Sequence, residues 1–248
     1  RAVEVVIPER EAEKHSLEKT GSTATVVDSL KETEVEMCIA LGGDGTILRA
    51  FNRLRDMKTP VLGINFGTIG FLAALGPSAI PEKLEAVLAG DYTVMELCML
   101  DLELEDGRFQ AVNDVVFQKA EGTSVAHLGY EINGIEMDSY KCDGLVASTP
   151  AGSTAYNLSN GGPLASLELD VMILTAIAPH CLRSRAMILG GGEKLTVNNR
   201  SGEADTAYVD GQKIGILDSA AKAMVSISKQ KARLVRTAET DFYGALRE

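Results

Sequence analysis

The chain has 248 residues, with 24 Lys and Arg against 35 Asp and Glu, so its formal net charge at pH 7 is −11. An apolar share of 45% with 24% charged residues is ordinary for a globular protein and excludes wholesale disorder. The excess of acid argues against a nucleic-acid-binding protein, because the phosphate backbone attracts clustered Lys and Arg. No apolar run reaches the ~18 residues of a membrane span, so we expect no membrane partner.

The cysteines give little indication of a disulfide or a metal site. Cys38, Cys98, Cys142 and Cys181 lie far apart, without a C-x-x-C pair or a histidine at ligand spacing. No basic and apolar leader precedes the first predicted strand, although Arg1 is not an initiator Met and the natural chain could begin earlier. We therefore expect free thiols and a cytoplasmic location.

The first ninety residues alternate between short apolar runs and helical patterns. This βαβ order is typical of a doubly wound parallel sheet, so we expect a Rossmann-like α/β domain over residues 1–92. The predicted buried strands are Val3–Ile7, Ala24–Val27, Met37–Leu41 and Val61–Ile64, and the predicted helices are Glu9–Lys19, Thr46–Arg55 and Pro81–Leu88.

Beyond residue 92 the pattern changes to short strands separated by turn pairs such as Asn133-Gly134. Such a series is typical of an all-β sandwich, which we place over residues 93–237, leaving open whether the tail 238–248 returns to the first domain. The predicted strands are Thr93–Glu105, Phe109–Gln118, Val125–Ile132, Leu145–Ser148, Val171–Ile177, Ala186–Leu189, Lys194–Val197, Ala207–Val209, Ile214–Leu217, Ala223–Ile227 and Leu234–Arg236.

A glycine-rich segment, Gly42-Gly43-Asp44-Gly45-Thr46, follows one predicted strand and precedes an amphipathic helix. Glycines let the backbone approach phosphate closely, and the amides at a helix start attract anions. A carboxylate in such a phosphate cradle is unfavourable unless it takes a proton or coordinates Mg²⁺. This suits phosphoryl transfer, in which Asp44 orients or deprotonates the attacking hydroxyl. The alternative is a tight turn in which Asp44 only caps the helix.

Two further polar segments could bind a ligand. Asn65–Leu72 follows the next strand at the same sheet edge, and its Phe66 could offer an aromatic face to a base, or the segment could be a turn followed by core packing. Asn113 and Asp114 fall inside the predicted strand Ala111–Phe117. There the pair could read a ribose and an adenine edge, or could be a bulge that faces solvent.

The segment from Ser148 to Ser159, followed by Gly161-Gly162-Pro163, is rich in hydroxyl side chains. Hydroxyl groups bind phosphate or ribose without adding positive charge, and Tyr156 adds a stacking surface. The alternative is a Ser/Thr-rich surface loop.

The pairs Asp143-Gly144 and Asp210-Gly211 are hairpin turns by default, with Lys141 and Gln212 as their exposed neighbours.

In their order along the chain, these segments resemble the motif set of the NAD kinase family over residues ~40 to 212. The glycine-rich motif alone is shared with diacylglycerol-type lipid kinases, and the segment beginning at Ser148 makes the resemblance specific. The resemblance implies an α/β domain followed by a β-sandwich-like domain, with the site between them. It also implies that ATP, another triphosphate or polyphosphate phosphorylates the 2′-hydroxyl of the adenosine ribose of NAD, giving NADP. A homodimer or homotetramer is expected.

The resemblance further assigns roles to single residues. Asp44 would accept the proton of the 2′-hydroxyl, and Mg²⁺ would be carried by the donor phosphates rather than by protein ligands. The donor phosphates would lie on Gly42, Gly43, Gly45 and Thr46. The residues that would bind NAD are Asp44, Gly45, Arg49, Phe66, Asn113, Asp114, Lys141, Asp143, Thr154, Ala155, Tyr156, Asn157, Leu158, Ser159, Ala178 and Gln212. The family more often has Asn-Glu where this chain has Asn113-Asp114, so the acid is shorter here.

Two other functions are open to the same motifs. A lipid kinase would need an apolar acyl slot and a membrane-facing surface, and the sequence shows no such stretch. A non-catalytic dinucleotide sensor could dispense with Asp44, which this chain retains.

Overall fold

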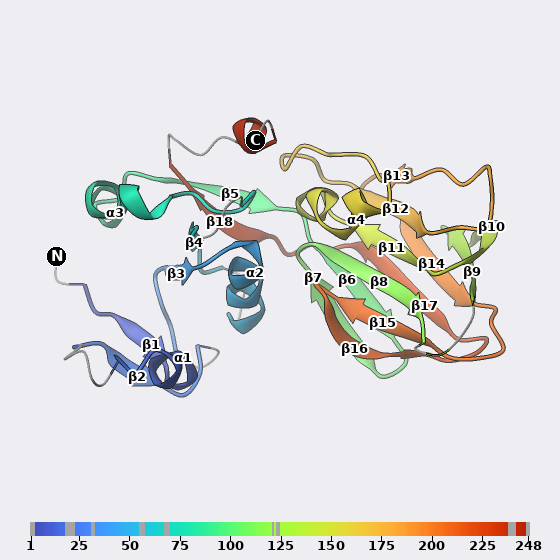
Figure 1. Cartoon of the computed structure of the whole chain (residues 1–248), viewed down its shortest axis with the longest axis horizontal. Helices are drawn as coiled ribbons and strands as arrows, with labels where there is room; N and C mark the ends of the chain where they lie inside the picture. The colour runs from blue at the N-terminus through green and yellow to red at the C-terminus, as the bar shows by residue number, and fades with distance from the viewer. Residues whose placement is uncertain are drawn as a thin grey trace.

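The computed structural model describes residues 3–17, 23–30, 33–54, 58–66, 70–120, 122, 125–237 and 242–246. It has two parts, a smaller α/β part that contains the first strands and helices, and a larger part built of strands (Figure 1). The middle of the second polar segment, residues 67–69, lies outside the described residues, as do the ends of the predicted helices at Lys19 and Arg55 and much of the tail. Among the described residues, no helix is long and apolar enough to cross a membrane.

The α/β part contains two separate sheets. Strands β1 (Val6–Pro8) and β2 (Thr25–Val27) pair in parallel and are joined through α1 (Glu9–Lys14). A four-stranded sheet has the order β3-β4-β18-β5, in which β3 and β4 are parallel. These strands are β3 (Cys38–Leu41), β4 (Val61–Ile64), β18 (Ala232–Arg236) and β5 (Thr93–Leu97).

Helices cover both faces of the four-stranded sheet, as a doubly wound fold requires. On one face, Val61 of β4 packs in the same cluster as Ile47 and Phe51 of α2 (Asp44–Arg53). On the other face, Leu62 packs with Val87 of α3 (Ile80–Leu88), which follows the short helix η2 (Pro77–Ala79). The expected α/β class is therefore confirmed for this part of the chain.

The helix α2 approaches the sheet closely because β4 carries a glycine. A Cβ on Gly63 would lie 2.3 Å from Cδ1 of Ile47, which is itself fully buried. At its other end, Arg53 forms an ion pair with Glu11 of α1, with 2.8 Å between Nη1 and Oε1. These contacts fix the helix that begins with the glycine-rich motif.

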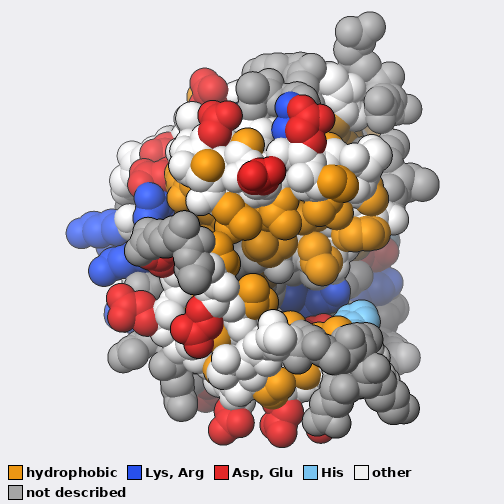
Figure 2. Space-filling model, turned by 90° about the vertical axis from the view of Figure 1, so that its left-hand side faces the viewer, with side chains coloured by type: hydrophobic (Ala, Val, Ile, Leu, Met, Phe, Trp, Pro, Cys, Tyr) orange, Lys and Arg blue, Asp and Glu red, His pale blue; other side chains and the backbone are white. Residues whose placement is uncertain are grey.

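The expectation that β3 is a fully buried strand is wrong. Its side chains Ile39 and Leu41 are 39% and 61% exposed, because β3 forms the edge of the sheet. Figure 2 shows hydrophobic side chains gathered on this end of the molecule.

The predicted strand Thr93–Glu105 is also wrong, because it divides into two strands of different sheets. Strand β5 belongs to the four-stranded sheet, and β6 (Leu100–Leu104) belongs to the larger part. The connection through Cys98 and Met99 is buried, so the apolar run continues without a break. The chain returns beside this connection, where the Ser228 amide donates to the Met99 carbonyl at 2.8 Å. The division at residue 92 remains a prediction.

The larger part is the expected β-sandwich, two six-stranded sheets around one core. The first sheet has the order β10-β9-β14-β17-β6-β7, with β10 (Ile135–Cys142), β9 (Ala126–Ile132), β14 (Lys194–Asn199), β17 (Lys222–Ile227) and β7 (Gly107–Ala111). The second has the order β13-β12-β11-β8-β15-β16, with β13 (Met187–Leu189), β12 (Met172–Ile177), β11 (Gly144–Ser148), β8 (Asp114–Lys119), β15 (Asp205–Val209) and β16 (Gln212–Leu217).

Three short helices complete the described structure. The helices η3 (Ala151–Thr154) and α4 (Tyr156–Ser159) follow β11, and α5 (Phe242–Ala245) lies near the C-terminus. The ring of Phe242 contacts Phe71 edge-on, with 6.1 Å between the ring centroids. This contact brings the described piece of the tail back to the α/β part.

Candidate active site

The glycine-rich motif forms the turn from β3 into α2. The amide of Gly42 donates to the carbonyl of Ile64 at 2.9 Å, so the turn lies where β3 and β4 end. The φ angle of Gly42 is +148°, and a Cβ there would lie 2.5 Å from Oγ1 of Thr46, so the position requires glycine. A Cβ on Gly43 or Gly45 would meet no atom within 4 Å. The described part of the chain therefore leaves open space on the Cβ side of these two residues.

Asp44 does not cap the helix, so the alternative interpretation of this residue is wrong. The N-cap of α2 is Gly43, without a side-chain capping hydrogen bond. The carboxylate of Asp44 instead accepts hydrogen bonds from the amides of Phe71 (2.8 Å) and Leu72 (3.1 Å), one on each oxygen. A Cβ on Gly70 would lie 3.0 Å from Oδ1 of Asp44, so glycine is needed for this close approach. The half-buried carboxylate is thus held in one orientation with lone pairs to spare.

A cavity of about 410 Å³ opens beside this helix, between the two parts of the chain. Its floor is the outer face of the second sheet, where Asp114, Val116 and Gln118 alternate along β8 with core residues such as Phe117. Tyr208 lies opposite Val116 on β15. Among the described residues, the lining is Leu48, Asn113, Asp114, Val116, Gln118, Ala155, Tyr156, Tyr208, Asp210 and Gly211.

One face of α2 connects this cavity to Asp44. Residues four apart share a helix face, so Asp44, Leu48 and Asn52 point to the same side. Leu48 lines the cavity, and the side chain of Asn52 lies near enough to Asp210 to lower the pKa of its carboxyl. Asp44 therefore lies about one helical turn, roughly 5–6 Å, from the cavity wall.

Asn113 lies in a break between two strands, so the expectation that it falls within one strand is wrong. Strand β7 ends at Ala111, and β8 begins at Asp114. The carboxylate of Asp210 interrupts the strand pairing, because it accepts hydrogen bonds from the amides of Val112 (3.1 Å), Asn113 (2.7 Å) and Asp114 (3.2 Å). The Oδ1 atom of Asn113 is buried without a hydrogen-bond partner. Within the described part of the chain this acceptor has no partner, and Asn113 itself belongs to the cavity lining.

The two carboxyl groups in the cavity are both perturbed. Burial, and then the nearby Asp210 carboxylate, raise the pKa of Asp114 to about 7. Burial also raises the pKa of Asp210, against the lowering effect of the three backbone amides and Asn52. Asp114 therefore changes protonation near neutral pH and can donate or accept a hydrogen bond there.

The hydroxyl-rich segment mainly supports the cavity wall. Ser148, Thr149 and Ser153 are fully buried. Oγ1 of Thr149 donates to the carbonyl of Val112 at 2.6 Å, and its backbone amide donates to the carbonyl of Asn113 at 2.8 Å. The expectation that hydroxyls of this segment bind phosphate or ribose is therefore wrong for these three residues. Their hydrogen bonds hold the neighbouring backbone instead.

The later residues of this segment occupy different positions. Ala155 and Tyr156 line the cavity, and Tyr156 is 36% exposed. The hydroxyl of Thr154 donates to the carbonyl of Ala151 at 3.2 Å. Asn157 is fully buried and bonds Ser153, Pro163 and Thr175. Leu158 and Ser159 are exposed on α4 and are not part of the lining.

Three of the predicted residues lie at the opposite end of β8. Asp143 pairs with Lys119, with 2.7 Å between Oδ1 and Nζ, and Lys141 is exposed at the end of β10. Ala178, with φ of +44°, follows β12, whose Ile177 pairs with Gly144. The six residues of β8 span ~17 Å, so the predicted set is spread along the strand rather than gathered at one point.

The two Asp-Gly pairs have different structures. Asp210-Gly211, with φ angles of +46° and +75°, is a two-residue hairpin between β15 and β16, and the exposed Gln212 follows it. Asp143-Gly144 is not a hairpin, because it links β10 to β11 in the opposite sheet.

Two further predicted residues are exposed beside the glycine-rich turn and the end of β4. The Arg49 side chain donates to Oγ1 of Thr46 at 3.0 Å, which places its guanidinium next to the turn. Phe66 follows β4 and is 58% exposed.

Sequence reasoning did not select Leu48, Asn52 or Asp210 as site residues. The spacing of four from Asp44 could have indicated Leu48 and Asn52. The alternation that starts at Asp114 could likewise have indicated Val116 and Gln118. Asp210 belongs to the motif set that carries the family resemblance, but it was not selected as a site residue, because its hairpin already explains an Asp-Gly turn.

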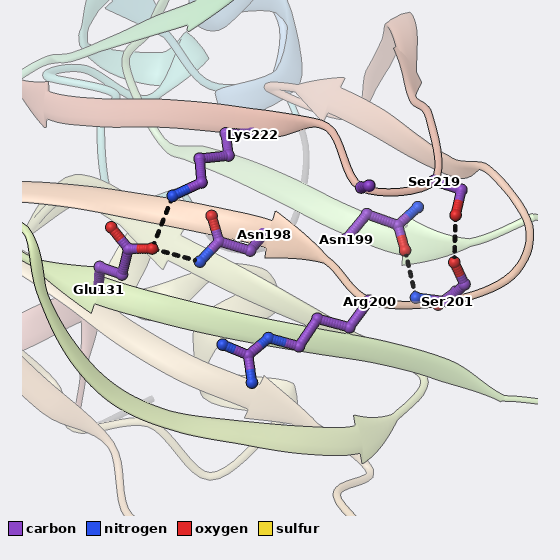
Figure 3. Close-up of a pocket in the computed structure, with 8 residues that line it drawn as sticks. Glu131, Asn198, Asn199, Arg200, Ser201, Ser219 and Lys222 are labelled. Carbon is purple, nitrogen blue, oxygen red and sulfur yellow. Dashed lines mark hydrogen bonds and ion pairs between the residues drawn. The ribbon is translucent and has the colours of Figure 1, made fainter.

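A second cavity of about 320 Å³ lies on the first sheet of the sandwich (Figure 3). Its charged groups largely neutralise one another, since Glu131 accepts from Lys222 (2.8 Å) and Asn198 (2.9 Å), and Arg200 pairs with Glu136. It contains none of the motif residues, so we assign the active site to the first cavity. Elsewhere in the described part of the chain, no three His, Cys, Asp or Glu side chains form a metal-binding group.

Comparison with known proteins identifies the family. The ATP-NAD kinase N-terminal domain matches residues 4–92, and the ATP-NAD kinase C-terminal domain matches residues 112–237. The NAD kinase of Natranaerobius thermophilus is 34% identical over 252 residues, covering 99% of this chain and 87% of that protein. The NAD kinase of Moorella thermoacetica is 36% identical over 241 residues, covering 94% of this chain and 78% of the Moorella protein.

Solved structures show the same fold. Yeast NADH kinase, complexed with NADH, is 23% identical with a TM-score of 0.88, covering 99% of this chain and 77% of that one. An NAD kinase from Archaeoglobus fulgidus, in complex with ATP, is also 23% identical, with a TM-score of 0.80 and 98% of each chain covered. From its sequence and its fold, the chain belongs to the NAD kinase family of phosphotransferases.

Proposed function

We propose that the 410 Å³ cavity binds NAD and that Asp44 accepts the proton of the ribose 2′-hydroxyl when ATP phosphorylates it. The observation that carries this proposal is the placement of Asp44. Its carboxylate is oriented by two backbone amides and lies about one helical turn from a cavity lined by the aromatic ring of Tyr156 and by Asn113, whose Oδ1 atom has no hydrogen-bond partner among the described residues. The NADH and ATP bound to the two solved relatives are the two ligand types that this arrangement requires.

The lining suits a nucleoside better than a phosphate. We assign the adenine to the exposed ring of Tyr156, which offers a stacking face, and the adenine amino group to Oδ1 of Asn113. Asp114 holds a ribose hydroxyl. The open amides of Gly43 and Gly45, together with Arg49, would hold the donor phosphates. Lys141, Asp143, Ala178 and Gln212 remain proposed contacts for the rest of the dinucleotide.

The reaction needs one proton transfer and one displacement. The 2′-hydroxyl gives its proton to a carboxylate oxygen of Asp44, and the ribose oxygen forms a bond to the γ-phosphorus. The bond from that phosphorus to the β,γ-bridging oxygen breaks, and ADP leaves with the electron pair. The two amides on Asp44 fix its direction, so the residue need not reorganise during transfer.

We also propose Mg²⁺ as the cofactor. Mg²⁺ in proteins commonly keeps several waters and binds the phosphate oxygens of the substrate, so the donor phosphates would carry the ion and the Asp44 carboxylate would stay free to accept the proton. When bound with the donor phosphates, the ion would neutralise their charge.

The test is the Asp44→Asn variant, incubated with NAD, ATP and Mg²⁺ while NADP formation is measured. We expect turnover to fall by about 10² or more, as for loss of a general base, while NAD binding by calorimetry is retained. Asp91→Asn is the matched control, because Asp91 is exposed in the turn after α3 and should leave turnover unchanged. Near-normal turnover of Asp44→Asn would show that the proton acceptor is another group.

The donor, the assembly and the compartment also belong to the proposal. We propose ATP as donor, a homodimer or homotetramer, and a cytoplasmic location. Replacing ATP with polyphosphate in the same assay tests the donor, and light scattering of the purified protein tests the subunit number.

A further inference from the structure

We propose that Asp210 is a positioning residue that fixes the NAD-binding segment 112–114 relative to the helix that carries Asp44. This role rests on the proposed function of the cavity. The argument comes from the contacts that the Asp210 carboxylate makes on its two sides.

On one side, Asp210 sets the backbone of the segment. It accepts three consecutive amides, those of Val112, Asn113 and Asp114, at 2.7 to 3.2 Å. The amide of Asp210 in turn donates to the carbonyl of Asp114 at 3.0 Å. These bonds hold the break between β7 and β8, at which Asn113 enters the cavity lining and at which its buried Oδ1 atom has no partner among the described residues.

On the other side, Asp210 lines the same cavity as Leu48 of α2, and the side chain of Asn52 on α2 lies near enough to lower the pKa of the Asp210 carboxyl. Asn52 lies two turns after Asp44 on the same helix face, with Leu48 of the cavity wall between them. Asp210 belongs to the sandwich and Asn52 to the α/β part. This contact therefore spans the two parts of the chain beside the cavity.

The conformation of Asp210 is suited to this double contact. Its φ of +46° is in the left-handed region, which only Gly, Asn and Asp adopt readily. A hairpin alone would accept Asn or Gly at this position. Only Asp, however, offers two acceptor oxygens to three amide donors and one side-chain amide. Asp is thus the residue that satisfies both the turn and the segment.

The experiment compares two substitutions. One removes the contacts of Asp210 with segment 112–114, and the other removes its contact with α2. Asp210→Asn keeps the left-handed turn but sets an amide donor against backbone donors, so segment 112–114 loses its support. We expect the KM and the calorimetric Kd for NAD to rise at least about tenfold, as for loss of a charge-assisted hydrogen bond. Asn52→Ala keeps the three hydrogen bonds from backbone amides to Asp210 and removes the contact between Asp210 and α2. We expect kcat to fall about fivefold or more, with the Kd for NAD within about twofold of wild type.

Asn133→Ala is the control for a general loss of stability. Asn133 occupies the equivalent left-handed position, φ +52°, in the hairpin between β9 and β10, where its Oδ1 accepts the Lys194 amide at 3.0 Å. We expect a lowered Tm with KM and kcat within about twofold of wild type. Equal kinetic losses in Asn133→Ala and Asp210→Asn would overturn the proposal.

A wild-type Kd for NAD in Asp210→Asn, or a wild-type kcat in Asn52→Ala, would also overturn it. If Asp210→Asn does not fold, the kcat and the Kd for NAD of Asn52→Ala decide whether the proposal stands. Absence of NADP formation by the wild-type protein would refute the proposed function instead, and the calorimetric Kd would still report on Asp210.

Discussion

The raised pKa of Asp114 predicts that this residue lowers stability at neutral and alkaline pH. The proposed perturbation is Asp114→Asn, which keeps the shape of the side chain and cannot ionise. In the folded protein, burial and the Asp210 carboxylate raise the pKa of Asp114 to about 7, whereas its ordinary value is 3.8. The folded state thus holds this proton over a pH range in which the unfolded chain has released it.

The sign of the effect follows from proton linkage. Between about pH 4 and pH 7 the folded state binds more protons, so the free energy of unfolding falls as pH rises through this window and is level above it. The separation of the two pKa values is about three units, each equal to about 1.4 kcal/mol. The ionised carboxylate therefore costs up to about 4 kcal/mol at pH 8, partly through its repulsion with Asp210.

The assay is urea unfolding of wild type and variant at pH 5 and pH 8. We expect Asp114→Asn to raise the free energy of unfolding by about 2–4 kcal/mol at pH 8, and by clearly less at pH 5. Asp205, whose pKa is raised to about 6, adds pH dependence of the same sign, but it is common to both proteins and cancels in the difference. Asp106→Asn, at an exposed turn position, is the control and should show no such difference. An equal effect of Asp114→Asn at both pH values would refute the reasoning.

Two further substitutions test the cavity wall. Gly152→Ala would place a Cβ 2.1 Å from the carbonyl oxygen of Asn113, and because backbone cannot move away cheaply, we expect a loss of about 1–3 kcal/mol in urea unfolding and a raised KM for NAD. Gly161→Ala, where a Cβ meets no atom within 4 Å but φ is +75°, gives the cost of backbone strain alone and should leave KM unchanged. Tyr156→Ala should raise the KM for NAD about tenfold or more with little change in kcat, since stacking stabilises the ground and transition states alike. An unchanged KM would argue against Tyr156 as the adenine platform.

Most of the fold follows from local patterns in the sequence. The predicted strand Val61–Ile64 has the bounds found in the structure, because its apolar run is buried on both faces, begins after Pro60 and ends at Asn65. Strand β10, Ile135–Cys142, was not predicted, since it is an edge strand whose mostly exposed side chains remove the alternation. The passage between sheets at Cys98 and Met99 was missed for the opposite reason. It is as buried as the strands it joins.

The candidate site was predictable where function depends on local sequence. The turn around Asp44 and the aromatic ring of Tyr156 come from motifs that are continuous along the chain. The role of Asp210 could not be recognised, because its amide partners lie almost one hundred residues earlier and a local Asp-Gly turn already explains the residue. The hydroxyls of Ser148 and Thr149 were predicted as ligand donors for a similar reason. Sequence shows that a polar group needs a partner, but not whether that partner is a ligand or the backbone.

The site also explains how a chain of net charge −11 can handle an anionic dinucleotide. None of the described residues that line the cavity is Lys, Arg or His, and two of them, Asp114 and Asp210, are acids. The carboxylate of Asp210 accepts hydrogen bonds from three backbone amides, which offset its charge, and Asp114 is partly protonated at neutral pH. The cavity is therefore less negative than its composition suggests, and its free groups accept hydrogen bonds from amino and hydroxyl donors. In the proposed function, the phosphates lie instead at the turn beside Arg49, where the glycine-rich segment leads into the start of α2. Because the contacts to the nucleoside and the contacts to the phosphates lie at separate places, few basic side chains are needed to hold the dinucleotide.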